Sequence, residues 1–67
     1  MEILRPNTSI RVIRAREGLT QKEFGESLGV STQTVALWEK NIYTISTSNL
    51  IKLCSTYHVS TFDLLGI

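Results

Sequence analysis

The feature that most constrains this chain is a 20-residue stretch, residues 21–40, that contains two helix starts separated by a glycine. Thr20 and Glu23 form the T-x-x-E pattern of a capping box, which predicts that a helix begins directly after Thr20. Gly29 can adopt the left-handed conformation that ends a helix. Ser31 is a second N-cap, so another helix is predicted shortly after the first one ends.

The apolar side chains of this stretch fall where two crossing helices would need them. Phe24 and Leu28 are four residues apart, and Val35 and Trp38 are three apart, so each pair shares one face of its helix. Gly25 lies near the predicted crossing, where a larger side chain would push the helices apart. Two short helices joined by a glycine-containing turn are the helix-turn-helix arrangement. An ordinary corner of two helices in a small bundle is the alternative.

Size and charge limit the class of protein. The 67 residues suffice for one domain, 1–67, whose core is marginal without tight helix packing or a partner. The formal net charge is +1, which argues against a protein that coats nucleic acid non-specifically but suits a dimer that neutralises a few phosphates. No signal peptide or membrane-spanning run is present in the sequence, so we expect a cytoplasmic protein with no membrane partner.

The lone cysteine and lone histidine do not form a convincing reactive site. Cys54 is the only cysteine, which excludes an intrachain disulfide and a cysteine-based metal site. His58 follows four residues later, so a Cys–His couple on one helix is geometrically conceivable. No orienting acid or glycine-rich phosphate loop accompanies the pair, and we therefore expect no enzyme, no cofactor and no metal. Cys54 is interpreted as a small core residue and His58 as a surface residue.

The first quarter of the chain and the segment after residue 40 also carry helix signals. Asn7 or Thr8 can cap a first helix that Gly18 ends. Its apolar stripe comprises Ile10 and Ile13. The segment 41–46 is predicted to be a loop in which Asn41 takes the left-handed conformation and closes the preceding helix.

Two further helices complete the pattern. Ser46 or Thr47 can start a fourth helix that runs through Tyr57, and its apolar side comprises Leu50, Leu53, Cys54 and Tyr57. Ser60 and Asp63 repeat the capping pattern before a last short helix that ends at Gly66. Because no alternating strand pattern occurs, the prediction is an all-α fold, a compact five-helix bundle.

The segments RAREGLTQKEFGESLGVSTQTVALWEKN and LIKLCSTYHVSTFDLLG resemble the lambda-repressor-like, Cro-type helix-turn-helix family, also called the XRE family. The resemblance covers residues 9–66 and depends on the combination of GLTQ, LGVS, WE and VS..LL. It implies a lambda-repressor-like DNA-binding domain whose second and third helices form the motif. It also implies a transcriptional regulator whose partner is a double-stranded DNA operator. The length fits short stand-alone members, and simple occupation of a promoter would make the protein a repressor.

In the resembling family the second helix of the motif lies in the major groove with its N-terminal residues at base edges. Since Val35 and Trp38 face the core, the base-reading residues are predicted to be Thr32, Gln33, Ala36 and Leu37. Gln33 is the best candidate, because a carboxamide can bond adenine N6 and N7 together. Leu37 stands where the family often has a polar or basic residue, and an apolar reading face favours half-sites that contain A·T pairs.

Gln21 occupies a family position that binds a backbone phosphate. The other candidates for backbone contact are Lys22, Ser31, Thr34, Lys40, Asn41, Tyr43, Thr44, Arg11 and Arg14. The loop after the reading helix lacks the Lys or Arg that the family often has there, so we expect a shallow salt dependence of DNA binding. Arg14 and Glu39 occupy positions that pair in the family and are predicted to fix the angle of the reading helix. Two unpaired surface charges are the alternative.

Family members bind as twofold dimers on half-sites about one helical turn apart. The predicted interface is the C-terminal segment, with Tyr57, Phe62, Leu65 and Ile67. Simple core filling by Phe62, and a weak homodimer that forms only on DNA, both stay open. The competing function is an antitoxin-like or co-regulator module with a protein partner, which the low charge and the apolar Ala36 and Leu37 would suit.

Overall fold

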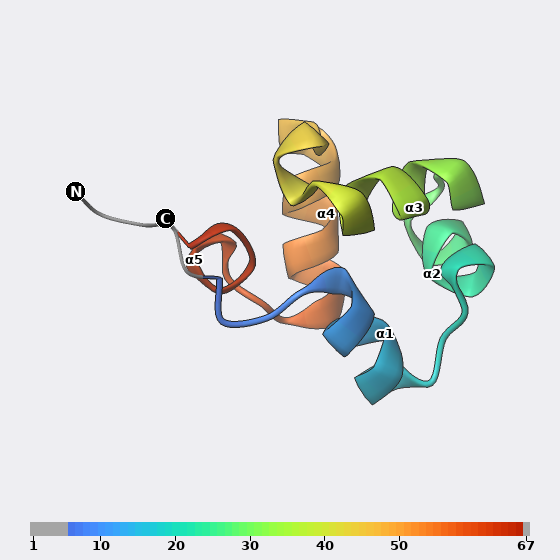
Figure 1. Ribbon diagram of the computed structural model, residues 1–67, viewed down its shortest axis with the longest axis horizontal. Helices are drawn as coiled ribbons and strands as arrows, with labels where there is room; N and C mark the ends of the chain where they lie inside the picture. The colour runs from blue at the N-terminus through green and yellow to red at the C-terminus, as the bar shows by residue number, and fades with distance from the viewer. Residues whose placement is uncertain (1–5, 67) are drawn as a thin grey trace.

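The computed structural model describes residues 6–66, which form five α-helices and one short 3-10 helix, so the chain is all-α as predicted. In chain order these are α1 (Ile10–Glu17), α2 (Gln21–Leu28), α3 (Thr32–Lys40), η1 (Ile42–Thr44), α4 (Thr47–Tyr57) and α5 (Thr61–Leu65). In Figure 1, α2 and α3 lie together at one end of the molecule and α5 lies at the other, with α4 between them. None of the helices in residues 6–66 has the length and apolarity that a bilayer span requires.

Side-chain caps set where the helices begin. The Thr20 hydroxyl accepts a hydrogen bond from the Glu23 N–H (3.1 Å), and the Glu23 carboxylate accepts one from the Thr20 N–H (2.9 Å), which confirms the capping box. Ser60 and Asp63 make the same reciprocal pair at the start of α5. Gly29 ends α2 in the left-handed region with a φ of 73°, also as predicted.

The predicted cap of the first helix is wrong. Ser9 caps α1, because its hydroxyl accepts a hydrogen bond from the Val12 N–H (3.2 Å). The N–H groups of Asn7 and Thr8 instead donate to the backbone carbonyl of Asp63, at 2.8 and 3.1 Å. These two residues therefore join the start of the described chain to α5 rather than beginning a helix.

Asn41 does not take the predicted left-handed conformation. Its backbone is extended, with φ −153° and ψ 100°, and its N–H closes α3 on the Leu37 carbonyl (2.9 Å). Its side-chain oxygen accepts from the Tyr43 N–H (3.0 Å) and starts η1 inside the segment 41–46, which the sequence pattern assigns to a loop. His58, with a φ of 56°, is a left-handed residue that the sequence analysis did not predict, and it ends α4.

The core lies where the helices meet, and most of the predicted apolar positions are part of it. Its buried side chains are Ile10, Ile13, Phe24, Leu28, Val35, Trp38, Leu53, Tyr57, Leu64 and Leu65. The rings of Phe24 and Tyr57 are stacked, with centroids 4.9 Å apart, and this contact fastens α2 to α4. Leu50 and Cys54, on the side of α4 predicted to be apolar, are only half-buried.

Two residues of the predicted dimer interface are buried in the core and cannot contact a second chain. Tyr57 and Leu65 are buried within the chain's own core, because α4 and α5 must cover the same apolar centre as α1 and α2. Phe62 is exposed on α5, so it does not fill the core. Ile67 lies outside the described residues. Of the four predicted interface residues, Phe62 is therefore the one with an exposed apolar side chain in the described part of the chain.

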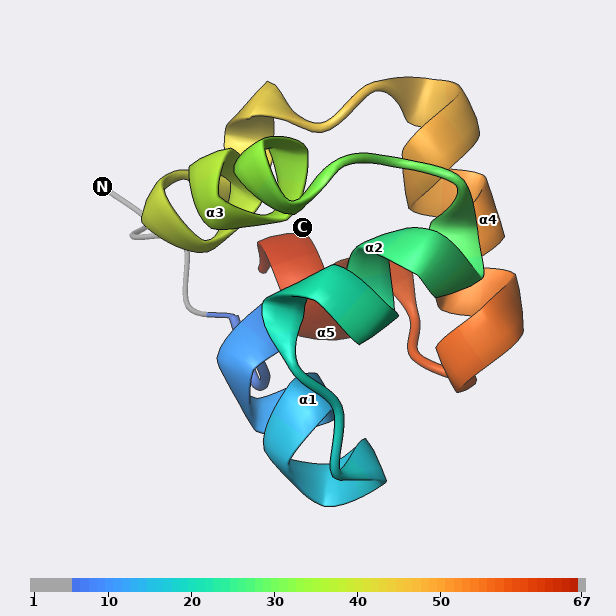
Figure 2. The same ribbon diagram turned by 90° about the vertical axis from the view of Figure 1, so that its right-hand side faces the viewer.

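Gly25 permits the close crossing of α2 and α3, whose arrangement is visible in Figure 2. A Cβ atom on Gly25 would lie 2.7 Å from the carbonyl oxygen of Val30 and 3.2 Å from a methyl group of Val35. The first distance is a clash with backbone, which cannot move without opening the turn between the helices. The absence of a side chain at this position is thus a condition of the helix-turn-helix geometry.

Gly25→Ala is expected to destabilise the protein by about 1–3 kcal/mol, because overpacking outweighs the better helix propensity of alanine. Thermal unfolding followed by circular dichroism would then show a melting temperature lower by roughly 4–20 °C. Gly29→Asn is the control, since no atom lies within 4 Å of a Cβ there and asparagine tolerates the left-handed region. Equal melting temperatures for Gly25→Ala and the wild type would refute the clash.

Candidate nucleic-acid interface

The helix α3 presents one face to the core and the opposite face to solvent. Val35 and Trp38 are buried, and they hold α3 against the rest of the bundle. The four predicted base-reading residues lie on the outer face and are all exposed: Thr32, Gln33, Ala36 and Leu37. Leu37 is a large apolar side chain on this outer face, and it is 50 % exposed.

The carboxylate of Glu39, at the end of α3, is the centre of a hydrogen-bonded cluster. Arg14 donates from Nε to Oε2 (2.6 Å) and from Nη2 to Oε1 (3.2 Å). Arg11 donates from Nε (3.1 Å) and Gln21 from its amide nitrogen (3.2 Å), both to Oε1. The Glu39 side chain is only 3 % exposed. One carboxylate thus joins α1, the start of α2 and the end of α3.

The charged forms of Glu39 and Arg14 stabilise each other. Burial by itself raises the pKa of Glu39, but the hydrogen bonds from Arg14, Gln21 and Arg11 outweigh it and hold that pKa below its ordinary value. The hydrogen bond to Glu39 in turn raises the pKa of Arg14. Arg14 also donates to the carbonyl of Leu19 (3.1 Å), so its guanidinium group is held at a second point. The predicted Arg14–Glu39 pair is therefore present, and it is part of a larger network.

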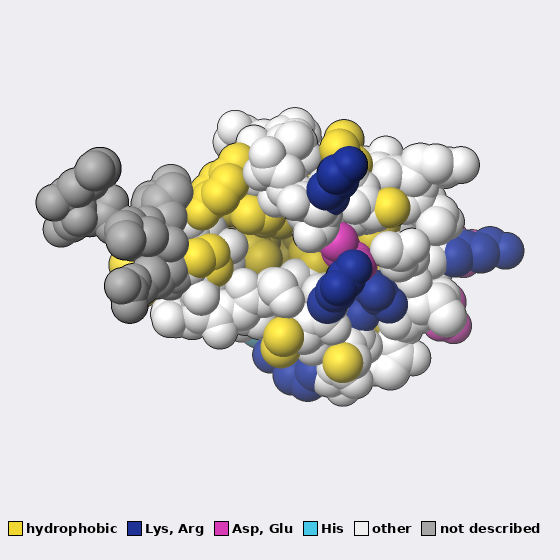
Figure 3. Space-filling view, in the orientation of Figure 1, with side chains coloured by type: hydrophobic (Ala, Val, Ile, Leu, Met, Phe, Trp, Pro, Cys, Tyr) yellow, Lys and Arg dark blue, Asp and Glu magenta, His cyan; other side chains and the backbone are white. Residues whose placement is uncertain are grey.

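Arg11 and Arg14 differ in how firmly they are held. The Arg11 side chain is 78 % exposed and makes one bond to Glu39, whereas Arg14 is mostly covered and makes two. Two guanidinium groups against one carboxylate leave one positive charge without a partner in the cluster. Figure 3 shows Lys and Arg side chains around an acidic group on the face that carries α1 and α3.

The other candidates for contact with a DNA backbone are arranged around the two ends of α3. At the first end, the hydroxyls of Ser31 and Thr34 bond each other (3.0 Å), and Ser31 caps the helix. Lys22 and Lys40 are exposed, and neither belongs to an ion pair within residues 6–66. The Thr44 hydroxyl donates its one O–H to the carbonyl of Asn41 (2.8 Å), so it cannot donate to a phosphate while that bond is made.

The Tyr43 hydroxyl is already engaged and is removed from the predicted phosphate donors. It donates to the backbone carbonyl of Leu65 at 2.7 Å. Leu65 is the last residue of α5, and the carbonyls at a helix end lack partners within the helix. The ring of Tyr43 therefore lies across η1 toward α5, and its role is to hold that helix.

Sequence reasoning missed several partners in this region. Arg11 lies three residues before Arg14 on one helix face, which is a signal that could have predicted a shared partner. No sequence signal indicates that the Gln21 amide bonds Glu39. Lys52 donates to the Leu28 carbonyl at the end of α2 (3.2 Å), a contact that depends on how α4 crosses α2.

The residues considered for reactive chemistry are poorly placed for it. Cys54 is half-buried, and burial, followed by the charge of Asp63, raises the pKa of its thiol. The thiolate form needed for nucleophilic attack or metal binding is thus disfavoured at neutral pH. The described residues contain no cluster of three His, Cys, Asp or Glu side chains that could hold a metal ion.

The chain is similar to known proteins along most of its length. The family model described as "Helix-turn-helix" matches residues 10–64. An "Uncharacterized HTH-type transcriptional regulator YgzD" of Bacillus subtilis (strain 168) is 36 % identical over 55 residues, which are 82 % of this chain and 83 % of that protein. The "HTH-type transcriptional regulator ImmR" of the same strain is 35 % identical over 57 residues, 85 % of this chain but only 45 % of ImmR. No solved structure gives a significant match.

Glu39→Gln is expected to lower the free energy of unfolding at pH 7 by about 1–3 kcal/mol, because it removes the charge that three donors share. A carboxylate whose pKa is lowered by folding contributes stability above the ordinary glutamate pKa, and that contribution is lost as the pH falls through the lowered value. Urea unfolding from pH 7 to pH 2.5 should therefore show the wild type and the variant converging in acid. A difference that stays constant over this range would contradict the ionic role of Glu39.

Proposed function

This chain belongs to the XRE-type helix-turn-helix family, and from that premise we propose that it is a sequence-specific DNA-binding regulator of transcription. The finer proposal is a repressor of the Cro type that binds a palindromic operator as a dimer. The helix α3 lies in the major groove in this proposal, and the protein acts by occupying a promoter.

The exposed outer face of α3 is the observation that carries this proposal. Thr32 and Gln33 lie in its first turn, where a helix-turn-helix protein brings side chains to base edges. Gln33 is proposed to bond adenine, and the methyl groups of Ala36 and Leu37 to contact thymine methyls. The core contacts of Val35 and the carboxylate of Glu39 fix the opposite face, so the reading residues keep a defined angle.

Backbone contacts are proposed at the start of α2, on α1 and at the end of α3. Gln21 retains a second amide N–H and a carbonyl oxygen beyond its bond to Glu39, and it begins α2, where free backbone N–H groups favour a phosphate. Lys22 and Lys40 would supply charge. Arg11 is proposed to leave Glu39 for a phosphate on binding, since Arg14 alone can keep the carboxylate paired.

The choice of bases tests this proposal first. Selection from random duplex DNA should give a palindrome with half-sites about one helical turn apart. Gln33→Ala should then lose discrimination at one base pair per half-site by about 1–3 kcal/mol, while Leu37→Arg changes the preference at a neighbouring position. A selection at low salt that enriches no motif would refute sequence-specific binding, and an unchanged base preference in Leu37→Arg would refute its contact.

The exposed side chain of Phe62 provides a test of the dimer. Phe62 is 57 % exposed, so Phe62→Glu should fold normally and yet weaken the pairing of two chains on a palindrome. Affinity for the full operator is expected to fall at least about tenfold, with affinity for an isolated half-site unchanged. Ile51→Glu, an equally drastic change at a 63 % exposed position on α4, is the control. Equal operator affinities for the two variants would exclude Phe62 from the interface.

A further inference from the structure

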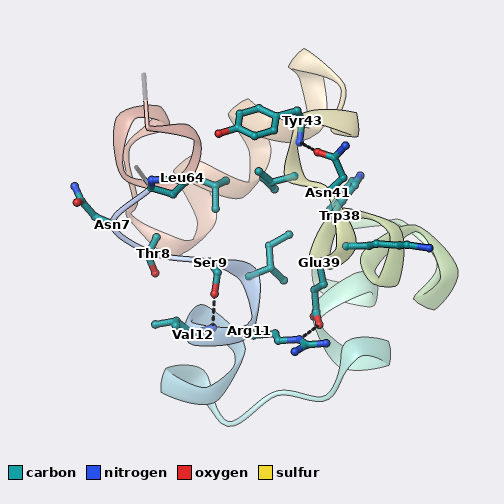
Figure 4. Close-up of a pocket in the computed structure, with 14 residues that line it drawn as sticks. Asn7, Thr8, Ser9, Arg11, Val12, Trp38, Glu39, Asn41, Tyr43 and Leu64 are labelled. Carbon is teal, nitrogen blue, oxygen red and sulfur yellow. Dashed lines mark hydrogen bonds and ion pairs between the residues drawn. The ribbon is translucent and has the colours of Figure 1, made fainter. Parts of the chain in front are cut away.

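An open groove lies beside α3 on the same face as the charged cluster. It has a volume of about 680 Å³, within the range of ligand sites in proteins. Its walls come from residues 6–9, the start of α1, the end of α3, η1 and α5. Figure 4 shows the lining side chains around the open space, and Figure 3 shows apolar atoms in a hollow on this face.

The floor of the groove is apolar and its rim carries exposed apolar side chains. Ile10, Trp38 and Leu64 line it and belong to the core. Val12 (55 % exposed) and Tyr43 (49 % exposed) line the groove from opposite sides, as Figure 4 shows. Large apolar side chains left in solvent around a concave surface are typical of a site that a partner covers.

The charges around the groove indicate the chemistry of that partner. Arg11, Glu39 and Lys40 are the charged side chains that line it. The Glu39 carboxylate is covered and its oxygens are occupied by three donors, so it offers little to a ligand. The exposed charges are those of Lys40 and of Arg11, both positive, and Arg11 keeps its bond to Glu39 while its side chain is largely in solvent. A groove with an apolar floor and a cationic rim complements an apolar side chain flanked by carboxylates.

We propose that this groove binds a short segment of a partner protein in which one or two large apolar side chains are flanked by Asp or Glu. The apolar side chains cover Ile10, Trp38 and Leu64, and the carboxylates pair with Arg11 and Lys40. The regulatory part of the proposal rests on the proposed DNA binding: because Arg11 and Lys40 are also proposed to face phosphates, the partner segment and DNA compete for the same cations.

The test begins with the purified protein and a library of random 12-residue peptides displayed on phage, selected without DNA. Peptides with an apolar residue between acidic ones should be enriched, and a synthetic copy of the best sequence should shift the amide resonances of α1, α3 and η1. Val12→Glu should weaken that peptide at least about tenfold by placing a like charge at the rim. Ile51→Glu is the matched control, outside the groove lining, and should bind the peptide normally.

Three outcomes would overturn the proposal: no acidic-apolar motif in the selection, equal affinity of the peptide for Val12→Glu and Ile51→Glu, or the same resonance shifts produced by raising the protein concentration alone. The last outcome would assign the groove to a second copy of the chain.

Peptide binding is measured without DNA, so its failure is separate from a failure to bind DNA. Competition is then measured with the selected operator, and peptide binding that leaves operator affinity unchanged would overturn the shared role of Arg11 and Lys40.

Discussion

The arrangement of the first three helices depends on one carboxylate. Glu39 receives hydrogen bonds from α1 and α2 while it is itself the next-to-last residue of α3, so the three helices meet at a single pair of oxygen atoms. An ion pair in water contributes little to stability. Here the Glu39 carboxylate is covered while the arginines keep contact with solvent, so the carboxylate depends on its donors more than they depend on it. The network therefore fixes the angle of α3 against α1 and α2.

Much of the fold could be predicted from the sequence because its signals are local. The capping boxes at Thr20 and Ser60 and the terminating glycine Gly29 each act within a few residues, and the structure contains all of them. The need for a small residue at Gly25 was predictable for a related reason, since the helix-turn-helix spacing indicates where the two helix backbones approach each other. The outward direction of Gln33 and Leu37 follows from the inward direction of Val35 and Trp38 on the same helix.

The features that were missed depend on contacts between segments that are far apart in sequence. Asn7 and Thr8 have side chains that can cap a helix. Their backbone N–H groups, however, donate to the carbonyl of Asp63, which is more than fifty residues away in the sequence. Tyr57 and Leu65 were predicted to belong to a dimer interface, but both are buried in the core, where the Tyr57 ring stacks on Phe24 of α2. The groove beside α3 has no sequence signal, because its lining comes from three separate segments, residues 6–12, residues 38–43 and Leu64.

The helix α5 has only five residues, which is too short for a helix to be stable in water on its own. Its order comes from other segments: the Asp63 carbonyl accepts the N–H groups of Asn7 and Thr8, and the Leu65 carbonyl accepts the hydroxyl of Tyr43. We therefore expect residues 7 and 8, η1 and α5 to open together as one unit of local unfolding. Because residues 7 and 8, η1 and Leu64 all line the groove beside α3, opening of the unit would dismantle that side of the groove, whereas the hydrogen bonds of Glu39 involve only α1, α2 and α3.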